Sequence, residues 1–266
     1  MLRLGRHGQA LLFGILALSL ALASSILGGR FVDPYGWIPL EAAVLVVLLC
    51  GGLRDRAAWS GFGIGSVGLR AWLPAIAIPG VVLIAGYVVA GVTGNVQLGL
   101  RGTSPVVFAA VTVAIVAAGS IEAIGEELGW RGYLLPRLDD LGRVRAGLVG
   151  GLLWAVWHTP LIYIAAAYHG GAGPLYMVSF TITIVAIGFI ANELRMASGS
   201  TWPAVVLHGA HNGILYQLGA LTVGSTGLLA GIGDESGIVP MTLYSLVAVW
   251  IVLRRPAWRS PIESTP

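Results

Sequence analysis

The sequence predicts an all-α protein built into a membrane, and three observations lead to this fold class. Hydrophobic residues make up 56% of the 266-residue chain and charged residues only 10%, whereas a soluble domain has about 45–50% and about 25%. The apolar residues form long runs, each close to the length that crosses a bilayer as a helix. The arginines lie mainly between these runs. We therefore expect a polytopic integral membrane protein of about eight transmembrane helices, forming a single membrane domain over residues 1–266.

Eight apolar runs define the expected helices, because one span takes about 20 mostly apolar residues. In chain order they are Ala10–Leu27, Ile38–Leu53, Ala71–Val92, Ser104–Trp130, Ala146–Tyr168, Leu175–Leu194, Thr201–Thr222 and Ile238–Leu253. The first run resembles a signal peptide but is longer than a usual one, so we expect a retained helix. Gly147 and Gly151 are four residues apart in the fifth run, a spacing that suits close helix packing in lipid.

The arginines predict the orientation of the chain. All 15 basic residues are arginine, and short cytoplasmic loops collect such residues. If the N-terminus is cytoplasmic, the cytoplasmic segments hold 13 of them: Arg3, Arg6, Arg54, Arg56, Arg70, Arg131, Arg137, Arg143, Arg145, Arg195, Arg254, Arg255 and Arg259. The opposite side holds only Arg30 and Arg101. We therefore expect a multi-pass protein of the cell membrane with both termini in the cytoplasm.

Several classes of function are disfavoured by composition. The arginines are scattered between apolar blocks and do not form the basic stripe that nucleic-acid binding needs. Cys50 is the only cysteine, which excludes an intrachain disulfide and a cysteine-rich metal site. Any metal would need histidine and carboxylate ligands. The expected surroundings are membrane lipid, and no nucleic-acid partner is expected.

The first candidate site motif is Glu126-Glu127-Leu128-Gly129-Trp130-Arg131 at the end of the fourth run, with Glu122 one turn earlier. Ionisable groups inside spans are costly, so each is a functional candidate. On a helix, Glu127 and Arg131 share a face in the favourable order for an ion pair. Glu126 is rotated by about 100° and faces elsewhere. We expect Arg131 to hold Glu127 while Glu126 stays available for chemistry. The alternative is a charged helix end at the headgroup level.

Two histidine motifs follow in later runs. Trp154-Ala155-Val156-Trp157-His158 places a histidine about twelve residues into the fifth run, roughly 18 Å along the helix. His208-Gly209-Ala210-His211-Asn212 places His208 and Asn212 on one face of the seventh helix, with His211 beside them. Each motif has a structural alternative, namely a packing histidine in the first case and an interhelical hydrogen bond in the second.

The predicted topology brings these motifs together. The fourth run ends at the cytoplasmic side just after Glu126, and the fifth and seventh runs enter from that side. All three motifs therefore lie between the membrane midplane and the cytoplasm. An acid, two histidines and an amide at similar depth suit water activation and oxyanion stabilisation in a peptide hydrolase. Three other polar residues of the spans are expected to be structural: Glu41, Asn192 and Glu193.

Taken in order, the three motifs closely resemble the CPBP family of intramembrane endopeptidases, which comprises CAAX prenyl proteases and bacteriocin-processing (Abi) proteins. The resemblance covers about residues 104–216, that is, the fourth to seventh helices, and the stretch before His208 also looks like the family. The departure is Trp154, where the family usually has phenylalanine. We interpret it as a change of aromatic packing.

The resemblance implies a role for each motif residue. Glu126 would act as general base on a water molecule that His158 helps to bind. His208 and Asn212 would stabilise the oxyanion. Glu127 and Arg131 would have supporting roles, in agreement with the predicted ion pair. No cofactor is implied, and the substrate would be a peptide or protein at the membrane.

The sequence is also compatible with two other functions. Glu126, His158 and His208 match the His₂Glu ligand set of some zinc hydrolases, although HExxH is absent. A non-catalytic transporter or membrane partner protein would also place polar residues in spans, but no internal repeat is evident. The sequence does not identify the substrate, its prenylation, the oligomeric state or the pathway.

Overall fold

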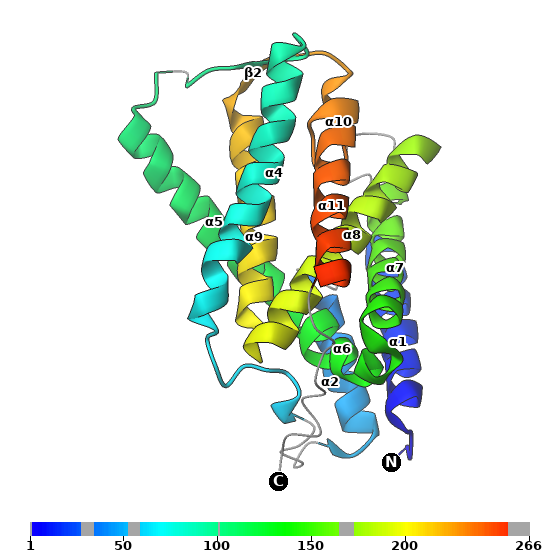
Figure 1. Cartoon of the computed structure of the whole chain (residues 1–266). Helices are drawn as coiled ribbons and strands as arrows, with labels where there is room; N and C mark the ends of the chain where they lie inside the picture. Colours follow the sequence, from blue (N-terminus) through cyan, green and yellow to red (C-terminus); the bar gives the residue numbers. More distant parts are fainter. Residues whose placement is uncertain (1, 28–34, 53–58, 101, 165–172, 255–266) are drawn as a thin grey trace.

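The all-α class is confirmed by a computed structural model of the chain, which describes residues 2–27, 35–52, 59–100, 102–164 and 173–254 (Figure 1). The longer helices are α1 (Arg6–Ile26), α2 (Ile38–Leu49), α4 (Trp72–Val92), α5 (Pro105–Glu127), α7 (Gly142–Tyr163), α8 (Pro174–Ser198), α9 (Trp202–Leu221) and α11 (Ile238–Arg254). Shorter helical elements are η1 (Tyr35–Trp37), η3 (Leu69–Ala71), η4 (Leu128–Leu134), α6 (Leu135–Leu138), η5 (Asp139–Leu141) and α10 (Leu229–Ile232). Strands β1 (Val96–Leu98) and β2 (Thr222–Ser225) pair antiparallel.

All eight predicted runs are helical, and their ends differ by a few residues. The predicted ends at Leu53 and Tyr168 lie outside the described residues. The fourth run differs in helix type, because its α-helix ends at Glu127 and the chain continues as a π-helix, η4. A π-helix is a wider coil that is common at functional sites. The first candidate motif therefore spans a change of helix type that the sequence pattern did not reveal.

The described helices fit a membrane protein. Four stretches are long and apolar enough to cross a bilayer: Arg6–Ile26, Leu69–Val92, Pro105–Tyr163 and Pro174–Ser198. The third stretch is 59 residues long and contains both α5 and α7. Two further apolar helices, at Tyr35–Leu49 and Ile238–Arg254, are shorter. The total of eight spans thus remains a prediction, while the polytopic membrane class is supported.

Helix α9 lies in the middle of the packed helices and contacts α4, α5 and α8 (Figure 1). Helix α8 also packs against α7 and α11, and α1 packs against α2 and α7. The β1–β2 pair and α10 lie at the end of the molecule opposite the start of α1 (Figure 1). This arrangement places α5, α7, α8 and α9 around a common interior.

Glycines set how closely these helices approach. A Cβ atom on Gly147 would come within 2.5 Å of the Phe189 ring, and one on Gly151 within 3.0 Å of the Val185 Cα. The predicted close packing at these two glycines is therefore present, between α7 and α8. Gly209 of α9 lies directly against Ser120 of α5, where a side chain would overlap the backbone. These contacts bring the motif helices together.

Candidate active site

Glu127 is the most buried of the candidate residues, with no exposed surface. Its Oε1 accepts a hydrogen bond from Arg131 Nη1 at 2.8 Å, so the predicted ion pair is present. The same oxygen lies 2.9 Å from Nδ1 of His208. Glu127 thus links the first and third motifs, a contact that spacing along the chain did not reveal because the two residues are 81 positions apart.

Arg131 is held on three sides. Besides Glu127, its Nε donates to Asn192 Oδ1 at 3.3 Å, and its guanidinium lies 4.3 Å from the centre of the Trp154 ring. The expectation that Asn192 is structural agrees with this contact. Glu193 likewise forms an ion pair with Arg143 at 3.3 Å. Through Asn192 and Trp154, Arg131 fixes helices α8 and α7 relative to the first motif.

Glu126 faces away from this ion pair, as its helical rotation predicts. It is half-buried, and its Oε2 accepts a hydrogen bond from the indole Nε1 of Trp154 at 2.8 Å. Trp154 therefore adds a hydrogen bond to the expected change of aromatic packing. A phenylalanine has no N–H donor and cannot make this bond. Trp154 therefore orients the Glu126 carboxylate through Oε2.

His158 is buried one turn beyond Trp154 on α7, and its Nδ1 lies 2.8 Å from the Trp154 carbonyl oxygen. A carbonyl only accepts, so Nδ1 carries the proton. In the neutral ring, Nε2 therefore carries the lone pair. The ring stands edge-to-face against Trp157 and Phe180, with centroids 4.8 and 5.3 Å away. The tautomer and the direction of the ring are both fixed by the surrounding helix.

His208, His211 and Asn212 lie within about one turn of α9. The Nδ1 of His208 contacts the Glu127 carboxylate, and the Nδ1 of His211 lies 2.8 Å from the hydroxyl of Tyr244. Both histidines are buried, whereas Asn212 is half-buried. The predicted shared face of His208 and Asn212 is present, because both residues line one cavity.

This cavity lies between α5, α7, α8 and α9 and has a volume of about 50 Å³. Room for one water takes about 10–15 Å³, so the cavity has space for a few water molecules. Its polar lining consists of Glu126, His158, His208, His211, Asn212 and Glu235. The structure brings together four of the candidate residues here, and Glu127 and Arg131 lie behind them. No motif in the sequence pointed to Glu235, which lies in the loop before α11.

The arrangement offers a carboxylate, two imidazoles and an amide around space for water. Such groups can remove a proton from water and donate hydrogen bonds to a developing negative charge. Among the residues that the structure describes, no three histidine, cysteine or acidic side chains are grouped as metal ligands would be.

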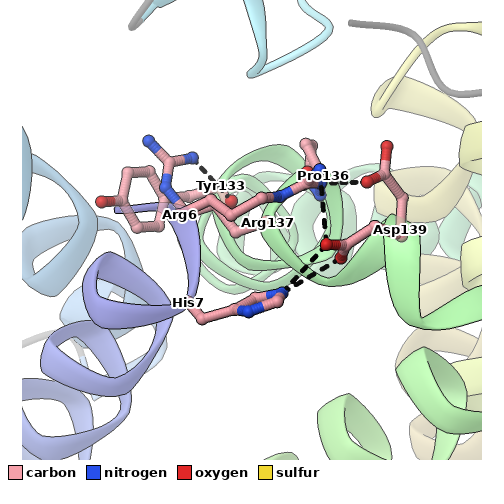
Figure 2. Close-up of polar contacts among 7 residues, drawn as sticks. Arg6, His7, Tyr133, Pro136, Arg137 and Asp139 are labelled. Atoms are coloured by element: carbon pink, nitrogen blue, oxygen red, sulfur yellow. Dashed lines mark hydrogen bonds and ion pairs between the residues drawn. The ribbon is translucent and has the colours of Figure 1, made fainter. Parts of the chain in front are cut away.

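A second polar cluster holds the chain directly after the first motif. Arg6 of α1 pairs with Asp139 and donates to the carbonyl oxygen of Pro136, as Figure 2 shows. Arg137 donates to Gln9 of α1 at 3.0 Å, and its guanidinium lies over the Tyr133 ring. These contacts tie η4 and α6 to the first helix.

Comparison with known proteins reveals the family to which this site is similar. Residues 105–214 match the model of a family described as type II CAAX prenyl endopeptidase Rce1-like. The resemblance predicted from the sequence is confirmed. A relative, CAAX prenyl protease 2 of Methanococcus maripaludis, is 32% identical over 74 residues. These residues make up 26% of this chain and 27% of the relative, so the match spans about a quarter of each protein.

The CAAX-protease-like core, residues 105–214, contains all six candidate residues. It also contains the described parts of α5, α7 and α8 that line the cavity. Glu235 lies outside the core, as do α1, α2, α4 and α11. The flanking helices therefore add contacts to the site that the family match does not cover.

Proposed function

We propose that this protein is an intramembrane endopeptidase that hydrolyses a peptide bond of a membrane-associated protein or peptide. The observation that carries the proposal is the meeting of three separate motifs around one small cavity, with Glu126, His158, His208 and Asn212 all in its lining. The CAAX-protease-like core covers the same residues and supports the same reaction class.

In the proposed mechanism, Glu126 is the general base. Trp154 holds its Oε2, so Oε1 takes the proton from a water molecule as the water attacks the peptide carbonyl carbon. The lone pair on Nε2 of His158 accepts the second hydrogen bond of this water. The proton on Glu126 then passes to the leaving nitrogen of the peptide.

His208 and Asn212 are the proposed oxyanion donors. Since Nδ1 of His208 donates to Glu127, its Nε2 has a proton to donate only when the ring is an imidazolium. The imidazolium is the proposed working form, with its Nδ1–H bonded to the Glu127 carboxylate. Glu127 is thus proposed to support the oxyanion donor, and Arg131 holds Glu127 in place.

Glu126→Gln provides the direct test. We expect this variant to lose peptide hydrolysis while the detergent-purified protein remains folded, because glutamine keeps the shape and loses the base. Glu122→Gln is the matched control, since Glu122 is exposed one turn away on α5. The readout is a comparison of membrane peptides cleaved by each variant. Full activity of the Glu126→Gln protein would refute the mechanism.

The alternative with zinc bound by Glu126, His158 and His208 is decided by metal analysis. We propose that no metal is required, and we expect the purified active protein to keep its activity after chelation. Stoichiometric metal, with loss of activity on chelation and recovery on zinc addition, would identify these side chains as ligands. A zinc hydrolase would then replace the glutamate mechanism.

A further inference from the structure

A buried histidine that the proposed mechanism does not use lines the small cavity. His211 belongs to the same lining as His208 and Asn212, and only 6% of the residue is exposed. It follows His208 by three positions on α9 and directly precedes Asn212, so the three side chains lie within an arc of about 100° around the helix. His211 therefore borders the same space as the two proposed oxyanion donors.

One ring nitrogen of His211 is bound to a residue of another helix. Its Nδ1 lies 2.8 Å from the hydroxyl oxygen of Tyr244 on α11, and the centroids of the two rings are 5.7 Å apart. Tyr244 is almost fully buried, with 1% exposed, and it lies outside the CAAX-protease-like core. This hydrogen bond therefore joins a flanking helix to the lining of the active-site cavity.

The hydrogen bond determines which nitrogen of His211 carries the proton. Within the part of the chain that the structure describes, the Tyr244 hydroxyl has Nδ1 of His211 as its only hydrogen-bond partner. A buried hydroxyl that does not donate its proton destabilises the fold, so the hydroxyl donates to Nδ1. The neutral imidazole then carries its own proton on Nε2. His211 thus has an N–H donor for the cavity while the ring is uncharged.

His208 and His211 differ in the form of the ring that can donate from Nε2. Nδ1 of His208 lies against the Glu127 carboxylate, which only accepts, so Nε2 of this ring donates only from the imidazolium. Nδ1 of His211 lies against a hydroxyl that donates, so Nε2 of this ring donates from the neutral imidazole. The two rings therefore supply one charged and one neutral donor to the same cavity.

We propose that His211 is a third oxyanion donor, beside His208 and Asn212, and that Tyr244 is the positioning residue that sets its tautomer. N–H donors that are already oriented toward a developing negative charge lower the barrier, because they do not reorient during the reaction. His211 neither gains nor loses a proton in this role. The inference rests on the proposed peptidase function, and it adds to that function a catalytic residue and a positioning residue from outside the core.

Substitutions of His211 separate its two ring nitrogens. Asparagine can accept the Tyr244 hydrogen bond in place of Nδ1 but does not reach the position of Nε2, whereas glutamine can place an N–H donor there. The substrate is a membrane peptide that wild type cleaves and Glu126→Gln does not, synthesised with a quenched fluorophore. We expect His211→Asn to lower kcat by about 10²–10³-fold with little change in KM, as for other oxyanion donors. His211→Gln should recover most of this loss, and His7→Asn, at an exposed histidine of α1, should change nothing.

The tautomer is measured without any substrate. Nitrogen NMR of protein with isotope-labelled histidine distinguishes a protonated ring nitrogen from one that carries a lone pair, and the signals that disappear in His211→Asn belong to His211. At neutral pH we expect a neutral His211 ring with its proton on Nε2. Tyr244→Phe removes the donor to Nδ1, so part of the population should move the proton to Nδ1, and kcat should fall at an unchanged KM. A wild-type ring with its proton on Nδ1 would overturn the proposal.

The kinetic outcomes separate this proposal from the proposed function. An unchanged kcat in His211→Asn would refute the third donor and retain the peptidase function. Equal losses in His211→Asn and His211→Gln would also refute it, because the loss would then not depend on an N–H at the position of Nε2. If wild type cleaves no membrane peptide that Glu126→Gln leaves intact, the peptidase function itself is refuted, and the catalytic role of His211 with it.

Discussion

At the scale of single residues, the two adjacent glutamates have different surroundings. Glu127 is fully buried and bound to Arg131 and His208, whereas Glu126 is half-buried and bound to Trp154 at the edge of a cavity. The difference arises because consecutive residues on a helix point about 100° apart. One acid can therefore hold the structure and the other can act on water.

Trp154→Phe tests the hydrogen bond to Glu126. Phenylalanine keeps an aromatic ring but removes the donor, so Glu126 loses its fixed orientation. A hydrogen bond to a charged group contributes about 1.5–3 kcal/mol, and we expect kcat to fall by about 10–100-fold with little change in KM. Steady-state kinetics on one peptide substrate provide the measurement. An unchanged kcat would mean that Trp154 acts through packing alone.

Arg131→Ala tests the buried ion pair. This substitution leaves the Glu127 charge buried without its arginine, which costs about 3–5 kcal/mol in comparable cases. We expect a lower unfolding temperature in detergent as well as lower activity. The double variant Glu127→Gln/Arg131→Met removes both charges and should recover part of the stability, though not the activity. Equal stability of wild type and Arg131→Ala would contradict the assigned role.

At the scale of helical elements, the first helix holds the segment that follows the first motif. The side chain of Asp139 is almost fully buried, with 1% exposed, and it pairs with Arg6 of α1. The neighbouring Asp140 is 38% exposed and pairs with His7 at 3.1 Å. Figure 2 shows how these contacts bridge from α1 to the turn before α7. Helix α1, which lies outside the CAAX-protease-like core, thus holds the segment that follows η4 in place.

Asp139→Asn and Asp140→Asn form a matched pair that tests this support. Removing the buried acid should cost about 1–3 kcal/mol of stability, because the Arg6 head group loses its buried partner. Removing the exposed acid should cost less than about 1 kcal/mol, as for other surface ion pairs. Unfolding midpoints in one detergent give the comparison. Equal losses in the two variants would show that α1 is not held through Asp139.

At the scale of the whole molecule, the orientation determines which side of the membrane the β2–α10 end of the molecule faces (Figure 1). We predict a cytoplasmic N-terminus from the arginine count, which places β2 and α10 on the external side. In a Cys50→Ala background, Leu228→Cys should react with an impermeant maleimide on intact cells, because Leu228 is 62% exposed near α10. Gly5→Cys should react only after permeabilisation. The reverse pattern would invert the orientation.

The sequence by itself determined the class of the protein and predicted candidate site residues, four of which line one cavity in the structure. Long apolar runs predict membrane helices because the thickness of the hydrocarbon core requires about 20 apolar residues in each spanning helix. The pairing of Glu127 with Arg131 followed from helical spacing, because both residues belong to one continuous helical segment. The order of the three motifs was sufficient to indicate the family.

Only the tertiary structure decided the contacts between elements. The bond from Glu127 to His208 joins residues on different helices, and the helix periodicity of either motif says nothing about it. The donor role of Trp154 depends on how closely α7 approaches α5. Glu235 reaches the cavity because the loop before α11 packs against α8, where Tyr176 binds it. Such long-range contacts depend on side-chain packing between helices, which no local pattern in the sequence encodes.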